Sequence, residues 1–470
     1  MHISSLPGDY SIGSLGDGAY RFADFLSESG FSYWQLLPVC MTDECSSPYK
    51  SPGYYSVNPY LIDLGILHGE GLITDCELSA AIQRQPYSSE YDRLSNERIP
   101  LLFLAAQRFS DKRKVENFIN SHPGIRDAAL YLALRDKNGC APFREWRDVS
   151  PDPDRLFAWQ FIHYEFMRQW HLLKTYANSR GVSLIGDMPI YVAYESADVW
   201  SSPESFLLDG EMMPREVAGV PPDYFSEDGQ LWGNPLYDFE YMKKDGYSFW
   251  HSRIEHALDM FDGVRIDHFR AFDEYYSIPK DASSAKEGRW KKGPGLDLVD
   301  RIREWAGEKL IIAEDLGDIT DSVRELLSKS TLPGMRVIQF GLLGEDSLHL
   351  PHNYIHNTVA YSGTHDNNTL LGYVWELDSR DRERLFEYMG IRHSDWSAAV
   401  YDIISALLRS SAGLVILPVQ DLLGFGRDTR MNTPGLSRGN WSFRITEDNL
   451  SLLTENARTW RRLNSMYGRI

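Results

Sequence analysis

Four carboxylates of this 470-residue chain lie in, or directly behind, short apolar segments that have the length of buried β-strands. In chain order they are Asp187, Asp267, Glu314 and Asp366. When parallel strands build one sheet their carboxyl ends meet at the same edge, so we expect these side chains to lie close together. Clustered carboxylates either bind a metal ion or carry acid–base and nucleophilic chemistry.

The segment that contains Asp267 has the clearest arrangement of charged groups. Because side chains alternate along a strand, Arg265 and Asp267 share the face that points to the interior. Val264, Ile266 and His268 share the opposite face, which suits packing against helices. Arg265 and Asp267 are then about 6–7 Å apart. A buried arginine keeps a neighbouring carboxylate ionised, as a nucleophile requires, although a purely structural ion pair is the alternative.

A divalent metal site is the second interpretation of these carboxylates, because Glu314, Asp315, Asp318 and Asp321 could all offer oxygen ligands. No EF-hand loop, zinc spacing or other defined ligand pattern supports it, so we predict no metal and no cofactor. Asp315 is expected to cap a helix or to lie in a solvated turn. A retaining glycosidase mechanism fits better, in which one carboxylate attacks a sugar carbon and a second, about 5–5.5 Å away, protonates the leaving oxygen.

The elements that position these residues are strands alternating with helices. The expected strands are residues 34–39, 183–192, 263–269, 310–316, 335–340, 358–366 and 413–419, with residues 1–5 as a fragment of an eighth. The expected helices are residues 19–28, 156–179, 250–260, 298–304, 322–328, 380–389 and 398–408. Near-continuous apolar strands alternating with helices predict an α/β fold, a (β/α)8 TIM barrel over residues 1–470. A doubly wound sheet is the alternative, but no GxGxxG motif follows the first strand.

Two gaps between strands are too long for a single helix, and we predict that both hold large insertions in the βα loops. Residues 65–150 read as a mostly helical inserted subdomain, and residues 193–243 as a loop-rich subdomain over the cleft. A helix over residues 450–463 closes the chain, which leaves no room for a C-terminal β-sandwich domain.

The composition excludes several classes of partner. The chain carries 48 basic and 67 acidic residues, a net charge of −19, and has no basic patch, so we expect neither nucleic-acid nor membrane binding. No signal peptide or apolar span is recognisable, so we expect a cytoplasmic location. Aromatic residues make up 13% of the chain. An acidic and aromatic chain is compatible with a sugar-binding cleft, where carboxylates bind hydroxyls and rings pack on sugar faces.

The segments GVRIDHFRAF, IIAEDLG and SGTHDNNT resemble strand motifs of the α-amylase clan. Longer segments at residues 4–26, 34–39, 47–64, 186–200, 219–237 and 430–444 resemble amylomaltases, the 4-α-glucanotransferases of glycoside hydrolase family 77. The resemblance covers essentially the whole chain. It implies transfer of an α-1,4-glucan segment from a donor maltooligosaccharide to the 4-hydroxyl of an acceptor, through a covalent glycosyl–aspartate intermediate.

The resemblance also implies roles for individual residues. Asp267 matches the family's nucleophile, Glu314 its general acid/base, with a raised pKa, and Asp366 the third carboxylate, which stabilises the transition state. Arg265 matches the arginine beside the nucleophile. The other matched substrate-binding positions are His268, His365, Asp187, Tyr49 and Asn440, together with Trp232, Tyr224 and Phe225 in the loop that arches over the glucan.

Two rival functions remain open from the sequence. An α-amylase-like hydrolase shares the clan motifs, but the longer segments and the missing β-domain argue against it. A catalytically silent glucan-binding protein would have lost one or more of the catalytic carboxylates, whereas Asp267, Glu314 and Asp366 are all present.

Overall fold

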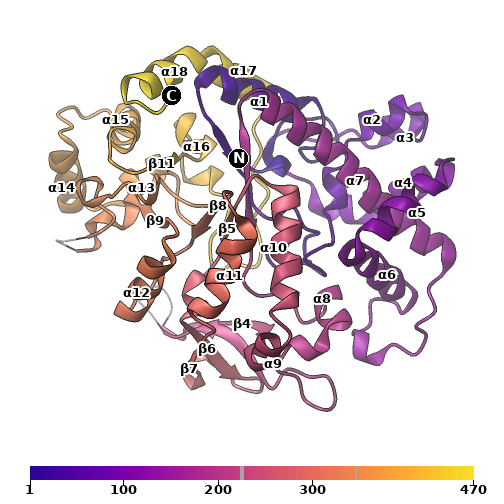
Figure 1. Ribbon diagram of the computed structural model, residues 1–470. Coiled ribbons are helices and arrows are strands. Elements are labelled where there is room, and N and C mark those ends of the chain that lie inside the picture. Colours follow the sequence, from indigo (N-terminus) through magenta and orange to yellow (C-terminus); the bar gives the residue numbers. More distant parts are fainter. Residues whose placement is uncertain (223–226, 345–346) are drawn as a thin grey trace.

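A computed structural model describes residues 1–222, 227–344 and 347–470. Within these residues, seven parallel strands form a near-closed barrel in the order β1-β2-β5-β8-β9-β10-β11, surrounded by helices (Figure 1). The predicted barrel fold is confirmed. The strands are β1 (Tyr33–Gln35), β2 (Ser183–Met188), β5 (Gly263–Ile266), β8 (Leu310–Ala313), β9 (Gly334–Val337), β10 (Thr358–Tyr361) and β11 (Leu414–Ile416).

Apolar side chains fill the interior of the barrel beneath its charged rim. They form one cluster, made of Ile185, Ile312, Met335, Val337, Val359 and Tyr361. Within β2 and β5, the parallel register places Asp187 beside Arg265. Each strand therefore contributes apolar side chains to the core before it reaches a polar residue near its carboxyl end.

The predicted eighth strand over residues 1–5 is wrong. Ile3–Ser5 form a short 3-10 helix, in which the backbone N–H of Leu6 donates to the carbonyl of Ile3 at 3.0 Å. Met1 nevertheless lies along β1, since its carbonyl accepts a hydrogen bond from the Trp34 indole at 2.6 Å. Backbone groups that bond within this tight turn cannot also join a strand ladder, which explains the error.

Seven of the nine helices that accompany the described barrel follow the predicted pattern, with ends extended by up to three residues, whereas Leu370–Glu376 and Val419–Leu422 were not predicted. The nine are α1 (Asp17–Ser29), α7 (Pro153–Ser179), α10 (Ser248–Met260), α11 (Leu296–Ala306), α12 (Asp321–Ser330), α13 (Leu370–Glu376), α14 (Ser379–Met389), α15 (Trp396–Leu408) and α16 (Val419–Leu422). The single helix expected over residues 450–463 is instead two, α17 (Glu447–Glu455) and α18 (Ala457–Met466), separated at Asn456. They pack near α1, and the described chain has no β-sandwich after the barrel.

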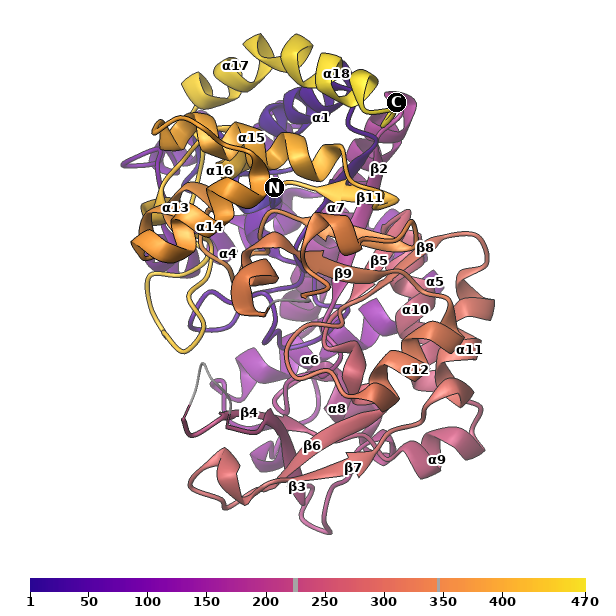
Figure 2. The ribbon, with the colours of Figure 1, turned by 90° about the vertical axis from the view of Figure 1, so that its left-hand side faces the viewer.

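Two groups of elements extend from the barrel loops. The first is helical and packs on α7; it comprises α2 (Leu64–Gly69), α3 (Asp75–Ala80), α4 (Tyr91–Arg108), α5 (Lys112–Ser121) and α6 (Pro123–Lys137). The second contains α8 (Ala197–Ser201), α9 (Phe239–Lys244) and an antiparallel sheet in the order β4-β3-β6-β7. Its strands are β3 (Glu216–Val220), β4 (Gln230–Pro235), β6 (Glu274–Pro279) and β7 (Arg289–Lys292). Figure 2 shows this sheet at the opposite end of the molecule from α17 and α18. Half of the sheet thus lies outside residues 193–243, the predicted insertion.

No helix of the described residues is long and apolar enough to cross a membrane.

Candidate active site

The four carboxylates occupy the same rim of the barrel. Asp187 lies in β2, Asp267 directly follows β5, Glu314 directly follows β8, and Asp366 lies in the loop after β10. Arg265 is buried between two of them. Its Nη1 lies 2.8 Å from Asp187 Oδ1 and its Nη2 lies 3.0 Å from Asp267 Oδ1. One guanidinium therefore holds two carboxylates in fixed orientation.

Tyr49 lies on the other side of Asp187. Its hydroxyl donates to Asp187 Oδ2 at 2.8 Å, and its ring stacks on the His365 ring with centroids 5.0 Å apart. Burial raises the pKa of Tyr49 well above its usual range, so the hydroxyl remains a donor. The Trp441 ring packs against both, at 5.7 Å from each. The carbonyl of Trp441 in turn accepts from the Tyr91 hydroxyl of α4, which ties the helical insertion to the site.

Glu314 is also buried and bonds two backbone groups. Its Oε2 accepts from the His268 backbone N–H at 2.6 Å and its Oε1 from that of Leu316 at 3.0 Å. Burial, and secondarily the charge of Asp267, raise the pKa of Glu314 to about 8, against the opposing charge of Arg265. The carboxyl is therefore mostly protonated at neutral pH, as a general acid must be.

His268 does not occupy the helix-facing side that strand alternation predicted. β5 ends at Ile266, and His268 has a left-handed φ of 51°, which turns its ring away from the strand pattern. The ring meets Trp232 edge to face at 4.9 Å. Burial lowers the pKa of His268 to about 3, and its Nε2 is buried without a hydrogen-bond partner in the described part of the chain. A neutral imidazole nitrogen with no partner suits a hydrogen bond to a sugar hydroxyl.

Asp366 is the most open of the four carboxylates, with 47% of its side chain exposed. Asn432 Nδ2 donates to its Oδ1 at 2.5 Å, and Arg430 donates to its carbonyl. The Asn432 backbone N–H also donates to the His365 carbonyl at 3.0 Å. Asn432 thus holds both His365 and Asp366.

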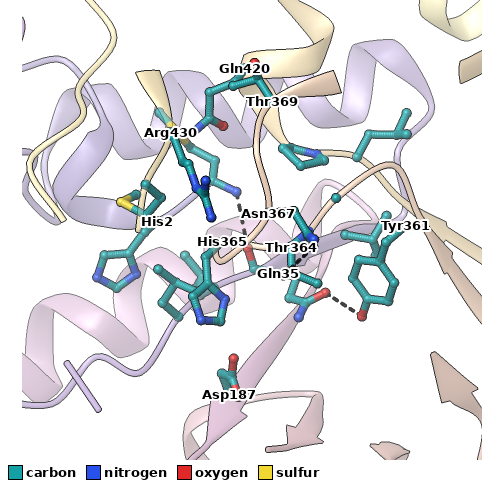
Figure 3. A pocket seen from close by; sticks show the side chains of 18 of the residues that line it. His2, Gln35, Asp187, Tyr361, Thr364, His365, Asn367, Thr369, Gln420 and Arg430 are labelled. Atoms are coloured by element: carbon teal, nitrogen blue, oxygen red, sulfur yellow. Dashed lines mark hydrogen bonds between the residues drawn. The ribbon is translucent and has the colours of Figure 1, made fainter. Parts of the chain in front are cut away.

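A cavity of about 100 Å³ opens between this rim and the interior of the barrel (Figure 3). Asp187, Arg265 and His365 line it, together with Tyr361, whose hydroxyl donates to Gln35 Oε1 at 3.0 Å. The described residues contain no group of three or more His, Cys, Asp or Glu side chains that could hold a metal ion. The site therefore combines a carboxylate held by an arginine, a protonated carboxyl and several hydrogen-bond donors. This combination of groups suits glycosyl transfer or hydrolysis.

Several enzyme families carry such a combination of groups, and similarity to known proteins shows to which of them the chain belongs. The model of glycoside hydrolase family 77, described as 4-alpha-glucanotransferase, matches residues 1–450. The chain belongs to the 4-alpha-glucanotransferase family. A family member from Aquifex aeolicus is 40% identical over 486 residues, covering 100% of this chain and 98% of the relative. One from Clostridium butyricum is 39% identical and covers 100% of both chains.

Two solved structures share the fold of this chain. Amylomaltase from Streptococcus agalactiae, determined in complex with acarbose, superposes with a TM-score of 0.94 at 35% identity, covering 100% of this chain and 98% of that one. Amylomaltase from Corynebacterium glutamicum shares the fold, with a TM-score of 0.78 at 17% identity, covering 99% and 74% of the two chains.

The structure does not test three further predicted substrate-binding residues. Tyr224 and Phe225 lie outside the described residues. The Asn440 amide bonds its own loop, accepting from the Thr433 N–H at 2.9 Å and donating to the Leu436 carbonyl at 2.8 Å. The substrate-binding role of Asn440 stays a prediction.

Asp315 corrects another expectation. It neither caps a helix nor lies in a solvated turn, but is buried, with its Oδ2 2.7 Å from Arg336 Nη1. It also accepts from the Met335 backbone N–H at 2.6 Å. Asp315 therefore has a structural role between β8 and β9, and offers no free oxygen for a metal. Asn432 was missed, although it lies inside the segment 430–444 that carries the family resemblance.

Proposed function

We propose that the protein transfers a segment of an α-1,4-glucan from a donor maltooligosaccharide to the 4-hydroxyl of another glucan or glucose, by a retaining double displacement. The observation that carries this proposal is the pairing of Asp267, held by Arg265, with the buried Glu314, whose pKa is raised to about 8. One carboxylate can attack while the other delivers a proton.

In the first step, an Asp267 oxygen bonds to the anomeric carbon as the glycosidic bond breaks. The electrons of that bond go to the leaving oxygen, which takes the proton of Glu314. Arg265 keeps Asp267 oriented, and the unpartnered Nε2 of His268 is available to bind a hydroxyl of the sugar. Asp187 is a further candidate for binding a hydroxyl, although its oxygens are bonded to Arg265 and Tyr49 here. Asp366 stabilises the positive charge that develops on the sugar.

In the second step, Glu314 acts as the base. The charge of Asp267 helps to raise the pKa of Glu314 in the free enzyme. Esterification removes that charge, so the pKa of Glu314 falls once its proton has been given away. The resulting carboxylate accepts the proton of the acceptor 4-hydroxyl as its oxygen attacks the anomeric carbon and releases Asp267.

Transfer requires that the acceptor reaches the intermediate before water does. Well-oriented groups can reach effective molarities of ~10⁵ M or more, so binding of the acceptor can decide the outcome. Trp232 lies against His268 at the site and is our candidate for holding the acceptor. Tyr224 and Phe225 are further candidates from the same segment of sequence.

Incubation with maltotriose tests this function against its two rivals. A ladder of longer maltodextrins together with glucose is expected, and only glucose and maltose would indicate a hydrolase. Glucan binding without any product would indicate a silent binding protein. Asp267→Asn is expected to abolish turnover with the fold intact, because amide nitrogen and oxygen are poor nucleophiles.

A further inference from the structure

The loop after β10 carries both His365 and Asp366, and two buried side chains from outside the loop join its ends. The first is Asp421 in α16, of which 3% is exposed. Its Oδ2 accepts from the Ser362 hydroxyl at 2.6 Å, where the loop begins. Its Oδ1 accepts from the Leu370 backbone N–H at 2.7 Å, where the loop ends and α13 starts.

The second side chain is Gln339, which follows β9 and is 8% exposed. Its Nε2 donates to the carbonyl of Ser362 and to that of Asn368, both at 2.9 Å. One amide group therefore bridges the two arms of the loop. The arms are so close to it that a Cβ on Gly363 would lie 2.7 Å from the Gln339 nitrogen.

These two residues connect the loop to both neighbouring strands. β10 lies between β9 and β11 in the sheet, Gln339 comes from the β9 side, and Asp421 comes from the β11 side. Four hydrogen bonds thus fix the base of a loop whose tip carries the polar groups of the site. Buried hydrogen bonds of this kind can define a side-chain position because leaving one unmade is costly.

We propose that Asp421 and Gln339 are positioning residues, which act on the reaction through Asp366 by holding the base of its loop. This rests on the proposed function, since it requires that Asp366 stabilises the transition state. Both carboxylate oxygens of Asp421 and the Nε2 of Gln339 bond the loop itself, so in this proposal the two residues act on its position and not on the substrate. Their effect is therefore expected on kcat more than on KM.

A double-mutant cycle tests the proposal. Gln339→Met keeps the shape of the side chain and removes its donor. We expect kcat for transfer to fall roughly 10- to 100-fold, the cost of a small misplacement of catalytic groups. The same substitution in an Asp366→Ala background is expected to change kcat by less than about twofold, because residues that act through one another are not additive. α-Maltosyl fluoride as donor keeps the slow variants measurable.

Gln169→Met is the matched control. Gln169 is a fully buried glutamine of α7 that donates to Glu165 Oε1 at 2.7 Å and accepts from the Asp63 N–H at 2.8 Å, away from the site. The Gln169→Met substitution should lower the unfolding temperature of the protein and leave kcat unchanged. Equal losses of kcat from Gln339→Met with and without Asp366 would overturn the proposal, as would an unchanged kcat.

Ser362→Ala provides a second variant should Gln339→Met not fold. It removes one of the two hydrogen bonds to Asp421 and is expected to give a smaller loss of kcat, again only when Asp366 is present. A failure of the proposed function would give a different experimental result. A wild-type enzyme that only hydrolyses maltotriose would refute the transferase, while the same cycle measured on hydrolysis would still test the two positioning residues.

Discussion

The protonation of Glu314 can be titrated, and it provides the most direct test of the mechanism. With a pKa of about 8, roughly 90% of this carboxyl is protonated at pH 7 and roughly 10% at pH 9. We therefore expect kcat/KM for maltotriose to fall about tenfold between these pH values. A glutamate with the ordinary pKa of about 4.3 would be only about 0.2% protonated at pH 7, so burial increases the active fraction several hundredfold.

The assay is initial release of glucose from maltotriose between pH 6 and 9.5, with α-maltosyl fluoride as a second donor. Fluoride leaves without protonation, so Glu314→Gln should retain the first step with the fluoride donor, seen as a burst of fluoride release, and lose cleavage of maltotriose. The alkaline decline should also be absent from the variant with the fluoride donor. A wild-type decline that begins below pH 6, or no decline through pH 9, would refute the assignment of Glu314 as the acid.

The raised pKa of Glu314 also makes the stability of the fold depend on pH. Between about pH 4.3 and 8, the folded protein holds the Glu314 proton and the unfolded chain does not, so stability falls as pH rises. The slope from this group is about 1.4 kcal/mol per pH unit, and it ends once the folded protein also loses the proton. The free energies of unfolding of Glu314→Gln and of the wild type can be measured in urea. The value for the variant should increase relative to that of the wild type from pH 5 to pH 8. A constant difference would contradict the burial argument.

Three further substitutions test other parts of the site. Trp232→Ala should raise the ratio of hydrolysis to transfer with maltotriose, and an unchanged ratio would remove Trp232 from acceptor binding. Tyr49→Phe removes the hydrogen bond to Asp187 and keeps the ring, so kcat/KM should fall roughly tenfold, about the value of a hydrogen bond to a charged group. Arg336→Met leaves the charge of Asp315 buried and unpaired, and should lower the free energy of unfolding by about 3 kcal/mol; a stability equal to that of the wild type in urea would show that the ion pair contributes nothing.

Local patterns were sufficient to predict most of the barrel and the four carboxylates. A buried strand is apolar over its length, and the residue that breaks the run marks its end, as at Asp267 and Glu314. The same patterns failed where tertiary contacts decide. Asp315 reads as a turn residue until Arg336 is placed beside it, and residues 1–5 read as a strand until their turn is formed.

For the same reason, local sequence patterns could not predict the side chains that hold the site residues in place. Asn432, Asp421 and Gln339 have no periodic or spacing signal that links them to Asp366. Their partners lie 23 to 66 residues away in the sequence. Only the closed sheet brings them together, so these contacts follow from the fold and not from the local sequence.

The packing of α18 on α1 also determines when the protein can finish folding. The Asn464 amide of α18 donates to the Ser29 carbonyl of α1 at 3.0 Å, across 435 residues of sequence, and Trp460 packs near Phe31. A ribosome adds about 5–20 residues per second, so α1 emerges roughly 20–90 s before its partner. During that time the surface of α1 that α18 later covers is open to other molecules. The surface of α1 is therefore completed only after the segment that forms α18 has also been synthesised.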